Sequence, residues 1–221
     1  MKREIITTKD GSKTIQLSDW NEQYHSKHGA ILEGRHVFIK TGLYYWLAQN
    51  QDKEVSILEI GFGTGLNALL NLIEASTKKI PINYTGIEAF PVLPSEIKQL
   101  NYAEILNIPK EDFLRLHQTE WEKTVKITAE FQLLKRKQQF SEIEDKASFD
   151  LIYFDAFGPR VQPDLWTEDI FEKMYAALKP DGVLVTYSAK GSVRRAMQAV
   201  GFVVERLPGP PGKREMLRAL K

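Results

Sequence analysis

The glycine-rich run from Ile57 to Asn67 constrains the fold of this chain more than any other stretch. It reads Ile-Leu-Glu-Ile-Gly-Phe-Gly-Thr-Gly-Leu-Asn, with apolar residues suited to a buried strand before it and apolar residues at helical spacing after it. Its three glycines allow positive φ and leave the backbone open to the close approach of a ligand. The run therefore predicts a strand, a tight turn and a helix, which is the opening unit of a doubly wound α/β fold.

The spacing of the glycines indicates the class of ligand. The pattern is G-x-G-x-G with Glu59 two residues ahead, whereas a dinucleotide fingerprint carries its third glycine one residue later. An acidic residue before such a turn is typical of S-adenosylmethionine-dependent methyltransferases, in which the carboxylate can face the ammonium of the methionine moiety. The spacing disfavours a nicotinamide oxidoreductase. A turn that only packs a helix on a strand remains the alternative.

Two further acids follow predicted strands. Glu88 ends the strand expected at 82–87, 23 positions after Gly65, close to the spacing at which an acid accepts hydrogen bonds from ribose hydroxyls. Phe90 is expected to form a wall beside the adenosine. Asp155 ends the strand expected at 149–154, and ligands of open α/β sheets bind outside the carboxyl ends of the strands. We therefore expect Asp155 next to the cofactor. For Glu88, an exposed strand-end glutamate is the alternative.

The order of predicted elements gives the fold class. We expect a class I S-adenosylmethionine-dependent methyltransferase fold: a Rossmann-like, doubly wound, mostly parallel seven-stranded sheet with an antiparallel edge strand. A small hairpin and cap would occupy residues 1–54, over the active site, and the Rossmann-like domain residues 55–221. Beyond the glycine run, the expected strands are 4–8, 13–17, 82–87, 130–134, 149–154, 183–187, 202–206 and 215–220, and the expected helices 66–73, 94–106, 167–178 and 192–200, with a polar excursion at 107–127.

Composition excludes several classes of protein. The 221 residues contain no cysteine, which excludes disulfides, thiolate nucleophiles and cysteine-ligated metal sites. No signal-peptide segment or membrane-length apolar run is present, so a cytoplasmic location is expected. His25, His28, Glu33 and His36 could suggest a metal site, but their spacing defines no tetrahedral set, and no metal is expected.

Positive charge gathers near the C-terminus. The whole chain has a formal net charge of +1, yet the last 32 residues hold eight Lys and Arg against two Glu, a local charge of +6. Such a cluster can be the footprint of a phosphate backbone, or a solvated basic face. Four of its members are taken as RNA contacts: Arg194, Arg195, Lys213 and Arg214.

Several motifs stand in the order found in one known family. They are Glu59-Ile-Gly-Phe-Gly-Thr-Gly-Leu-Asn67, Tyr153-Phe-Asp-Ala-Phe-Gly-Pro159, Gln162-Pro-Asp-Leu-Trp166, Lys213-Arg-Glu-Met-Leu217 and Tyr24-His-Ser-x-x-Gly-Ala-x-x-Glu33. With them the chain resembles, over nearly its whole length, the tRNA 5-(aminomethyl)-2-thiouridine methyltransferase family, meaning the methyltransferase half of MnmC-type enzymes or its stand-alone MnmD form.

The resemblance implies methylation of the aminomethyl nitrogen on the wobble uridine, in the anticodon loop of tRNA, with S-adenosyl-L-methionine as cofactor. A separate enzyme would supply the aminomethyl substrate, since the flavin-dependent half of the bifunctional enzymes needs a further large domain. Asp155 is the expected catalytic residue, accepting a proton from the amine or holding it by a hydrogen bond. Expected cofactor contacts are Glu59, Gly61, Phe62, Gly63, Thr64, Gly65, Asn67, Glu88, Phe90 and Asp155. Expected substrate contacts, besides the four basic residues, are Tyr24, Phe157, Gly158, Pro159 and Trp166.

For Tyr24, Phe157 and Trp166, stacking on the extruded base competes with plain core packing. The chain departs from the resembling family after the third core strand, where Lys135-Arg-Lys137 replaces an acidic residue that would bind adenine. Either Glu142 or Glu144 serves there, or backbone groups read the adenine. Two rival functions stay open: an aminopropyltransferase of the spermidine synthase type, and a non-catalytic RNA-binding module with the same fold.

Overall fold

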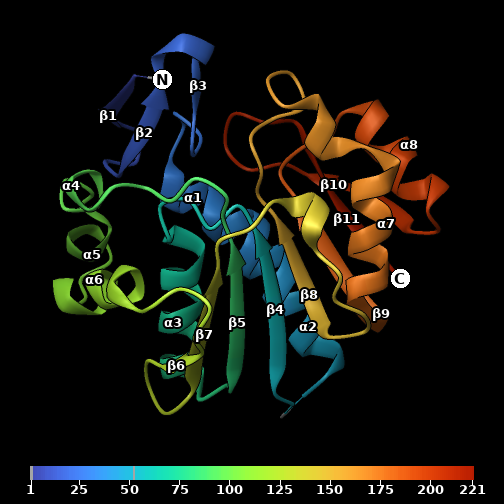
Figure 1. The fold of residues 1–221 in the computed structure, drawn as a ribbon, viewed down its shortest axis with the longest axis horizontal. Coiled ribbons are helices and arrows are strands. Elements are labelled where there is room, and N and C mark those ends of the chain that lie inside the picture. Colours follow the sequence, from blue (N-terminus) through green and yellow to red (C-terminus); the bar gives the residue numbers. More distant parts are fainter. Residues whose placement is uncertain (1, 52) are drawn as a thin grey trace.

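A mixed sheet forms the centre of the molecule, described here from a computed structural model that covers residues 2–51 and 53–221. The strand order over this part of the chain is β10-β11-β9-β8-β4-β5-β7-β6 (Figure 1). Five neighbouring strands are parallel: β9 (Leu178–Thr186), β8 (Phe149–Phe154), β4 (Val55–Ile60), β5 (Ile82–Ile87) and β7 (Phe131–Arg136). This order confirms the predicted class.

The antiparallel strands lie in other places than expected. The closing strand β11 (Glu215–Leu220) inserts between β9 and β10 (Val203–Pro208) and pairs antiparallel with both. Residues on both of its faces are buried, whereas Val203 of β10 is 66% exposed, so β10 is the strand that suits the edge. At the other edge the two-residue β6 (Val125–Lys126) pairs antiparallel with β7 and brings the described sheet to eight strands instead of seven.

The predicted N-terminal hairpin is confirmed. Strands β1 (Arg3–Thr7) and β2 (Lys13–Leu17) pair antiparallel, and β3 (Glu22–Gln23) adds to them after a 3₁₀ turn at Ser18–Trp20. The turn has Gly11 at φ +83°, and Asp10 Oδ1 accepts hydrogen bonds from the Ser12 backbone and the Thr8 hydroxyl. This small sheet stands above one end of the central sheet (Figure 1).

A long helical segment joins the hairpin to the central sheet. It begins as α1 (Ala30–Gly34), widens into a π-helix at Arg35–Leu43 and ends as α2 (Tyr44–Gln49). Gly42 permits close packing, since a Cβ there would lie 3.0 Å from Val185 and 3.1 Å from Tyr153. Residues on both sides of position 54 share one hydrophobic core. The division into 1–54 and 55–221 therefore stays a prediction.

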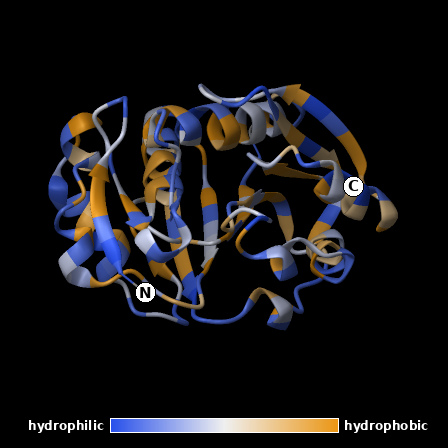
Figure 2. Ribbon diagram, turned by 90° about the horizontal axis from the view of Figure 1, so that it is seen from above, coloured by the Kyte–Doolittle hydropathy of each residue, from blue (hydrophilic) through white to orange (hydrophobic). Residues whose placement is uncertain are grey.

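Helices cover both faces of the sheet. On the face of the π-helix lie α3 (Leu66–Lys78), α4 (Pro94–Ile97), α5 (Tyr102–Ile105) and α6 (Lys110–Gln118). On the other face lie α7 (Glu168–Ala177), α8 (Gly191–Ala199) and the 3₁₀ turns Phe140–Glu142 and Pro163–Trp166. Hydrophobic and hydrophilic stripes alternate along these helices (Figure 2). No helix in the described ranges is long and apolar enough to cross a membrane.

Two predicted segments differ from the structure. The single helix expected at 94–106 is two short helices, because Asn101 interrupts it to dock the hairpin. Its side chain accepts a hydrogen bond from the Lys13 backbone at 2.8 Å and donates one to the Gly11 carbonyl at 3.0 Å. The polar excursion at 107–127 contains α6, whose buried Phe113 and Leu116 were too few to reveal a helix in the sequence.

Candidate functional site

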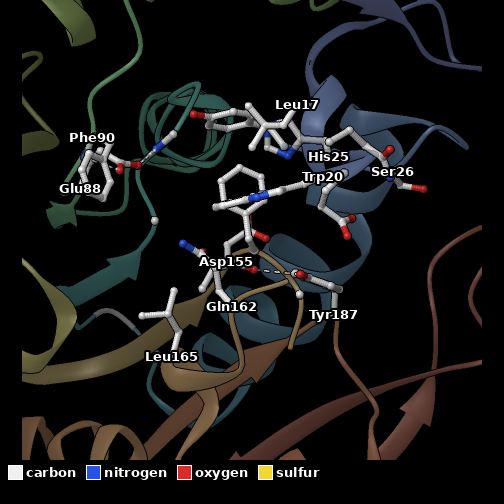
Figure 3. Close-up of a pocket in the computed structure, with 18 of the residues that line it drawn as sticks. Leu17, Trp20, His25, Ser26, Glu88, Phe90, Asp155, Gln162, Leu165 and Tyr187 are labelled. Atoms are coloured by element: carbon white, nitrogen blue, oxygen red, sulfur yellow. Dashed lines mark hydrogen bonds between the residues drawn. The ribbon is translucent and has the colours of Figure 1, made fainter. Parts of the chain in front are cut away.

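A cavity of about 1120 Å³ opens between the hairpin and the carboxyl ends of the central strands. Asp155, which follows β8, lies in this cavity, and Glu88 and Phe90, which follow β5, lie on the side away from Ser26 (Figure 3). The hairpin side contributes Tyr24 and its neighbours. Loops of the sheet and the N-terminal segment therefore enclose one space, at the end of the sheet where ligands of open α/β folds bind.

The glycine turn presents its backbone to this cavity. Gly61 and Gly63 line it at φ +91° and +49°. A Cβ on Gly63 would lie 3.0 Å from the Tyr24 ring, and one on Gly61 would lie 2.8 Å from the Asp155 carbonyl oxygen. Glu88 accepts hydrogen bonds from the backbone N–H of Gly63 at 3.0 Å and of Phe90 at 2.9 Å. Each carboxylate oxygen keeps a second lone pair for a ribose hydroxyl, so these residues fit S-adenosyl-L-methionine.

The remaining residues of the turn face other neighbours. Thr64 is buried, and its hydroxyl lies 2.7 Å from His25 Nε2 and 3.3 Å from the Tyr102 hydroxyl. Gly65 begins α3 at φ +70°, where a Cβ would lie 2.8 Å from His117 Nε2. Phe62 points into a second cavity of about 360 Å³ beside α6. These three expected cofactor contacts support the turn from behind.

Glu59 and Asn67 also lie behind the turn. Both are 1% exposed, and neither lines the cavity. Burial first, and then the nearby Asp155 carboxylate, raise the pKa of Glu59 well above its usual range. Asn67 Nδ2 donates to Glu59 Oε1 and to Asp155 Oδ2, each at 2.9 Å. Glu59 Oε1 thus contacts Asn67, and the expected contact of Glu59 with a methionine ammonium stays a prediction.

Asp155 lines the cavity, as do Glu22, Glu33, Glu88 and Glu96. The pKa of Asp155 is raised to about 7, chiefly by burial and also by the Glu33 carboxylate, against the lowering effect of the Asn67 hydrogen bond and the Lys213 ammonium. A carboxyl group that titrates near neutral pH is suited to take a proton from an amine and release it again. That Asp155 accepts a proton from the amine, as expected from the sequence, stays a prediction.

Aromatic side chains form one wall of the cavity. The Tyr24 and Phe157 rings meet edge to face with centroids 4.9 Å apart, and Trp20 packs on Phe157 at 6.1 Å. Tyr187, after β9, also lines the cavity and donates its hydroxyl to the Ala156 carbonyl at 2.8 Å (Figure 3). Such a wall can stack on a base.

Trp166 lies elsewhere. It is 5% exposed, packs against Phe154 and Phe171, and donates its indole N–H to the Phe157 carbonyl at 2.8 Å. The ring fills the core and supports Phe157 from below, so the expected stacking position is not the one observed. Gly158 lines the cavity, whereas Pro159 does not.

The basic C-terminal residues divide into two sets. Arg206 and Arg218 pair with Glu215 and Glu205, and Lys221 donates to the Tyr175 and Leu178 carbonyls. The set that remains for RNA is smaller than the charge count suggested: Arg195 and Arg214 are exposed, and Arg194 is half-buried. None of these three arginines lines the cavity.

Lys213 belongs to the cavity wall. Its ammonium pairs with the buried Glu33 carboxylate and lies 3.7 Å from the centre of the Tyr187 ring. Glu33 also accepts the Ser26 backbone N–H at 2.8 Å, and His36 Nε2 donates to the Pro208 carbonyl. His25, Glu33 and His36, considered as metal ligands, thus have separate partners, and residues 2–51 and 53–221 contain no group of three or more side chains that could hold a metal ion.

The loop after β7 borders the cavity where adenine is expected. Lys137, Gln139 and Phe140 line this part of the cavity. Lys135 turns away, is 1% exposed, and donates to the His117 carbonyl at 2.7 Å. Glu142 accepts the Gln139 backbone N–H and caps a 3₁₀ turn. Neither Glu142 nor Glu144 lines the cavity, which favours the backbone alternative for adenine.

Sequence reasoning missed several residues of the wall. Tyr187 could have been found, because it directly follows a predicted parallel strand and such strand ends meet at one edge of the sheet. Two other features depend on contacts between residues far apart in the sequence, and no local pattern signals them. They are the place of Trp20 beside Phe157 and the ion pair of Lys213 with Glu33.

Comparison with known proteins identifies the family of this chain. A family model described as S-adenosyl-L-methionine-dependent methyltransferase matches residues 95–221, more than half of the chain. The crystal structure of MNMC2 from Aquifex aeolicus aligns with a TM-score of 0.77 at 28% identity, covering 99% of this chain and 70% of that one. Spermidine synthase from Thermotoga maritima aligns with a TM-score of 0.59 at 14% identity, which shows a shared fold alone.

Curated proteins are also similar to this chain in sequence. The tRNA 5-methylaminomethyl-2-thiouridine biosynthesis bifunctional protein MnmC of Leptospira interrogans is 33% identical over 230 residues, covering 96% of this chain and 34% of that protein. Its counterpart in Hydrogenovibrio crunogenus is 28% identical and covers 97% and 33%. The chain thus spans about a third of the length of these relatives. From the glycine turn, the acids around it and these matches, the chain belongs to the S-adenosyl-L-methionine-dependent methyltransferase family.

Proposed function

We propose that this protein methylates the aminomethyl nitrogen of 5-aminomethyl-(2-thio)uridine at the wobble position of tRNA, giving 5-methylaminomethyl-(2-thio)uridine. The MnmC relatives and their printed names support this substrate, and the cavity has room for a cofactor and a base together. The observation that carries the proposal is Asp155, a carboxyl group with a pKa near 7 at the bottom of an aromatic-walled cavity beside the glycine turn.

Different residues of the site bind the cofactor and remove the proton. S-adenosyl-L-methionine, held by Gly61, Gly63 and Glu88, supplies an activated methyl group. An alkylammonium has no lone pair, so its nitrogen must lose a proton before it can form a bond to carbon. Ionised Asp155 takes that proton, a role typically contributing about 10²–10⁴-fold in rate. Holding both reactants in one cavity contributes further, by about 7–11 kcal/mol where alignment is good.

The base has to leave its stack to enter the cavity, as base-modifying enzymes require. Tyr24 and Phe157 provide ring surfaces for it, with Trp166 behind Phe157. The hairpin and the residues that follow it, within 3–28, cover the cavity. Arg194, Arg195 and Arg214 would contact phosphates of the anticodon arm.

Two partner assignments belong to the same proposal. A separate enzyme supplies the aminomethyl group, and the methyl transfer itself uses no metal. Its tRNA substrate implies action in the cytoplasm.

The direct test incubates the protein with labelled S-adenosyl-L-methionine and tRNA that lacks only this methyl group, followed by nucleoside mass spectrometry. A gain of one methyl group on the wobble nucleoside is the expected result. Labelled cofactor bound without transfer to any nucleoside would instead support a binding module.

The aminopropyltransferase alternative receives less support from the charges. A polyamine calls for several free acids in the cavity, yet Glu33 pairs with Lys213, Glu96 with Arg3 and Glu22 with Arg160, which leaves Glu88 and Asp155. Decarboxylated S-adenosylmethionine with putrescine should therefore give no product. Aminopropyl transfer to putrescine would instead identify the protein as an aminopropyltransferase.

A further inference from the structure

We propose that Asn67 is a positioning residue that acts through Asp155, and that it does not bind the cofactor. The inference rests on the proposed function, since it assigns the residue that orients the proposed base. Asn67 occupies the first turn of α3, directly after the glycine run, so its position in the sequence alone suggests a cofactor contact. The structure instead places its side chain behind the cavity wall.

One amide group serves two acids. Asn67 Nδ2 carries two hydrogens, and it donates to Asp155 Oδ2 and to Glu59 Oε1 at 2.9 Å each. Asn67 Oδ1 has no hydrogen-bond partner among the described residues. The reverse orientation of the amide would direct its oxygen at two carboxyl oxygens. Ionised Asp155 has no hydrogen to donate to an amide oxygen, so it determines the orientation of the amide.

The surroundings hold Asn67 in place. Its backbone carbonyl accepts Asn71 Nδ2 at 2.8 Å, and Asn71 Oδ1 accepts the Tyr153 hydroxyl at 3.1 Å. On the other side, the long helix passes so closely that a Cβ on Gly34 would lie 3.2 Å from Asn67 Oδ1 and 2.8 Å from Leu70. A side chain fixed in this way holds Asp155 in one orientation, which is the requirement for positioning a base.

The bond also has an electrostatic effect. A donor to the ionised carboxylate favours that form, so Asn67 counteracts the burial that raises the pKa of Asp155. The other titratable groups that interact with Asp155 come from several elements: Glu59 from β4, Glu33 from α1, Tyr84 from β5, Tyr102 from α5, Tyr187 after β9 and Lys213 from the C-terminal loop. Loss of the amide should leave all of these in place and raise the pKa of Asp155.

The test follows the Asp155 carboxyl group directly. The full-length protein is labelled with carboxyl-¹³C aspartate, the Asp155 signal is assigned by its absence from Asp155→Asn, and its titration is measured. We expect Asn67→Ala to raise the pKa on the order of one unit. Asn67→Ser, whose single hydroxyl reaches one acceptor at a time, should give a smaller rise and provides a second variant that folds in case Ala does not.

Asn71→Ala is the matched control. Asn71 lies one turn later on α3 and is equally buried, and its hydrogen bonds go to the Asn67 backbone carbonyl and the Tyr153 hydroxyl, not to either carboxyl group. The helix backbone and the close packing at Gly34 still hold Asn67 when the Asn71 bond is lost. It should lower the melting temperature without moving the titration of Asp155. In single-turnover assays with tRNA, the rising limb of the pH profile should move to higher pH in the Asn67 variants by the same amount as the carboxyl titration.

Three outcomes would overturn the inference. The first is an unchanged titration of Asp155 in both Asn67 variants, and the second is an equal shift in Asn71→Ala. The third is a large loss of S-adenosyl-L-methionine affinity in Asn67→Ser with no change in the titration, which would make Asn67 a cofactor contact. The titration uses no tRNA, so a protein that failed to methylate tRNA would refute the proposed function and leave this result readable.

Discussion

Lys213 forms an ion pair with Glu33, a residue 180 positions earlier in the chain. The pair joins the loop before β11 to α1 across the wall of the cavity, and the Lys213 ammonium also lies over the Tyr187 ring. Its position explains why one basic residue of the C-terminal cluster belongs to the site while most of the others do not.

Removing Lys213 should therefore destabilise the protein. Lys213→Ala leaves the Glu33 carboxylate without its cation at a site where only 7% of that side chain is exposed. We expect a loss on the order of 1–3 kcal/mol in the free energy of unfolding, less than for a fully buried pair because Lys213 is 31% exposed. Urea unfolding measures it. Arg195→Ala is the control, and an equal loss there would contradict the assigned role.

Asp155→Asn should slow methyl transfer by about 10²-fold or more in single turnover, because the amide cannot take a proton. Binding of S-adenosyl-L-methionine and tRNA should change little, since the loss lies in the transition state. Raising the pH should partly rescue the variant, because solvent then deprotonates more of the free amine. A rate within about threefold of wild type at neutral pH would make Asp155 structural.

The raised pKa of Asp155 also predicts how stability depends on pH. Between its ordinary value of 3.8 and about 7, the folded state holds a proton that the unfolded state has lost. The contribution of Asp155 to the free energy of unfolding therefore falls as the pH rises through this window. An asparagine side chain does not ionise, so Asp155→Asn does not lose this stability as the pH rises. The melting temperature of Asp155→Asn minus that of wild type should therefore be larger at pH 8 than at pH 4.5. A difference that is independent of pH would contradict the raised pKa.

The cofactor site predicts an effect of Glu88→Ala. This change removes the acceptor for a ribose hydroxyl and leaves the Gly63 and Phe90 backbone N–H groups without their partner. Calorimetry should show weaker binding of S-adenosyl-L-methionine at a nearly unchanged melting temperature. Glu96→Ala, which changes another acid of the same cavity, is the control. Equal affinities in Glu88→Ala and wild type would exclude the ribose contact.

The RNA surface predicts an effect of reversing three arginines. Arg194, Arg195 and Arg214 changed to Glu should weaken tRNA binding and flatten its salt dependence, by about 0.9 in slope per lost duplex phosphate contact. Lys213 is left intact because its reversal would disturb the cavity wall. Cofactor affinity should hardly change. An unchanged salt slope would identify these arginines as a solvated face.

Variants of Trp166 and Tyr24 should distinguish a side chain that stabilises the core from one that binds tRNA. Trp166→Ala opens a space in the core and should cost about 3–5 kcal/mol in the free energy of unfolding. Tyr24→Ala removes part of the aromatic wall and should weaken tRNA binding more than stability. Denaturant unfolding and filter binding on both variants measure the two effects, and a Trp166 variant with full stability would contradict the core position.

The sequence by itself determined the glycine turn, the two strand-end acids and the class of the sheet. These features are local: glycine spacing, apolar runs and the residue that ends a strand are written in consecutive positions. Parallel strands bring their carboxyl ends to one edge, so Glu88 and Asp155 had to lie near each other and near Gly63.

Only the tertiary structure decided which side chains reach the cavity. Glu59 and Asn67 stand in the motif yet lie behind it, because alternate residues of a buried strand face opposite sides and the first turn of α3 packs against the long helix. Trp166 packs in the core against Phe154 and Phe171. Lys213 lies in the cavity wall, where it pairs with Glu33. Such choices depend on contacts between distant segments, which no local pattern specifies.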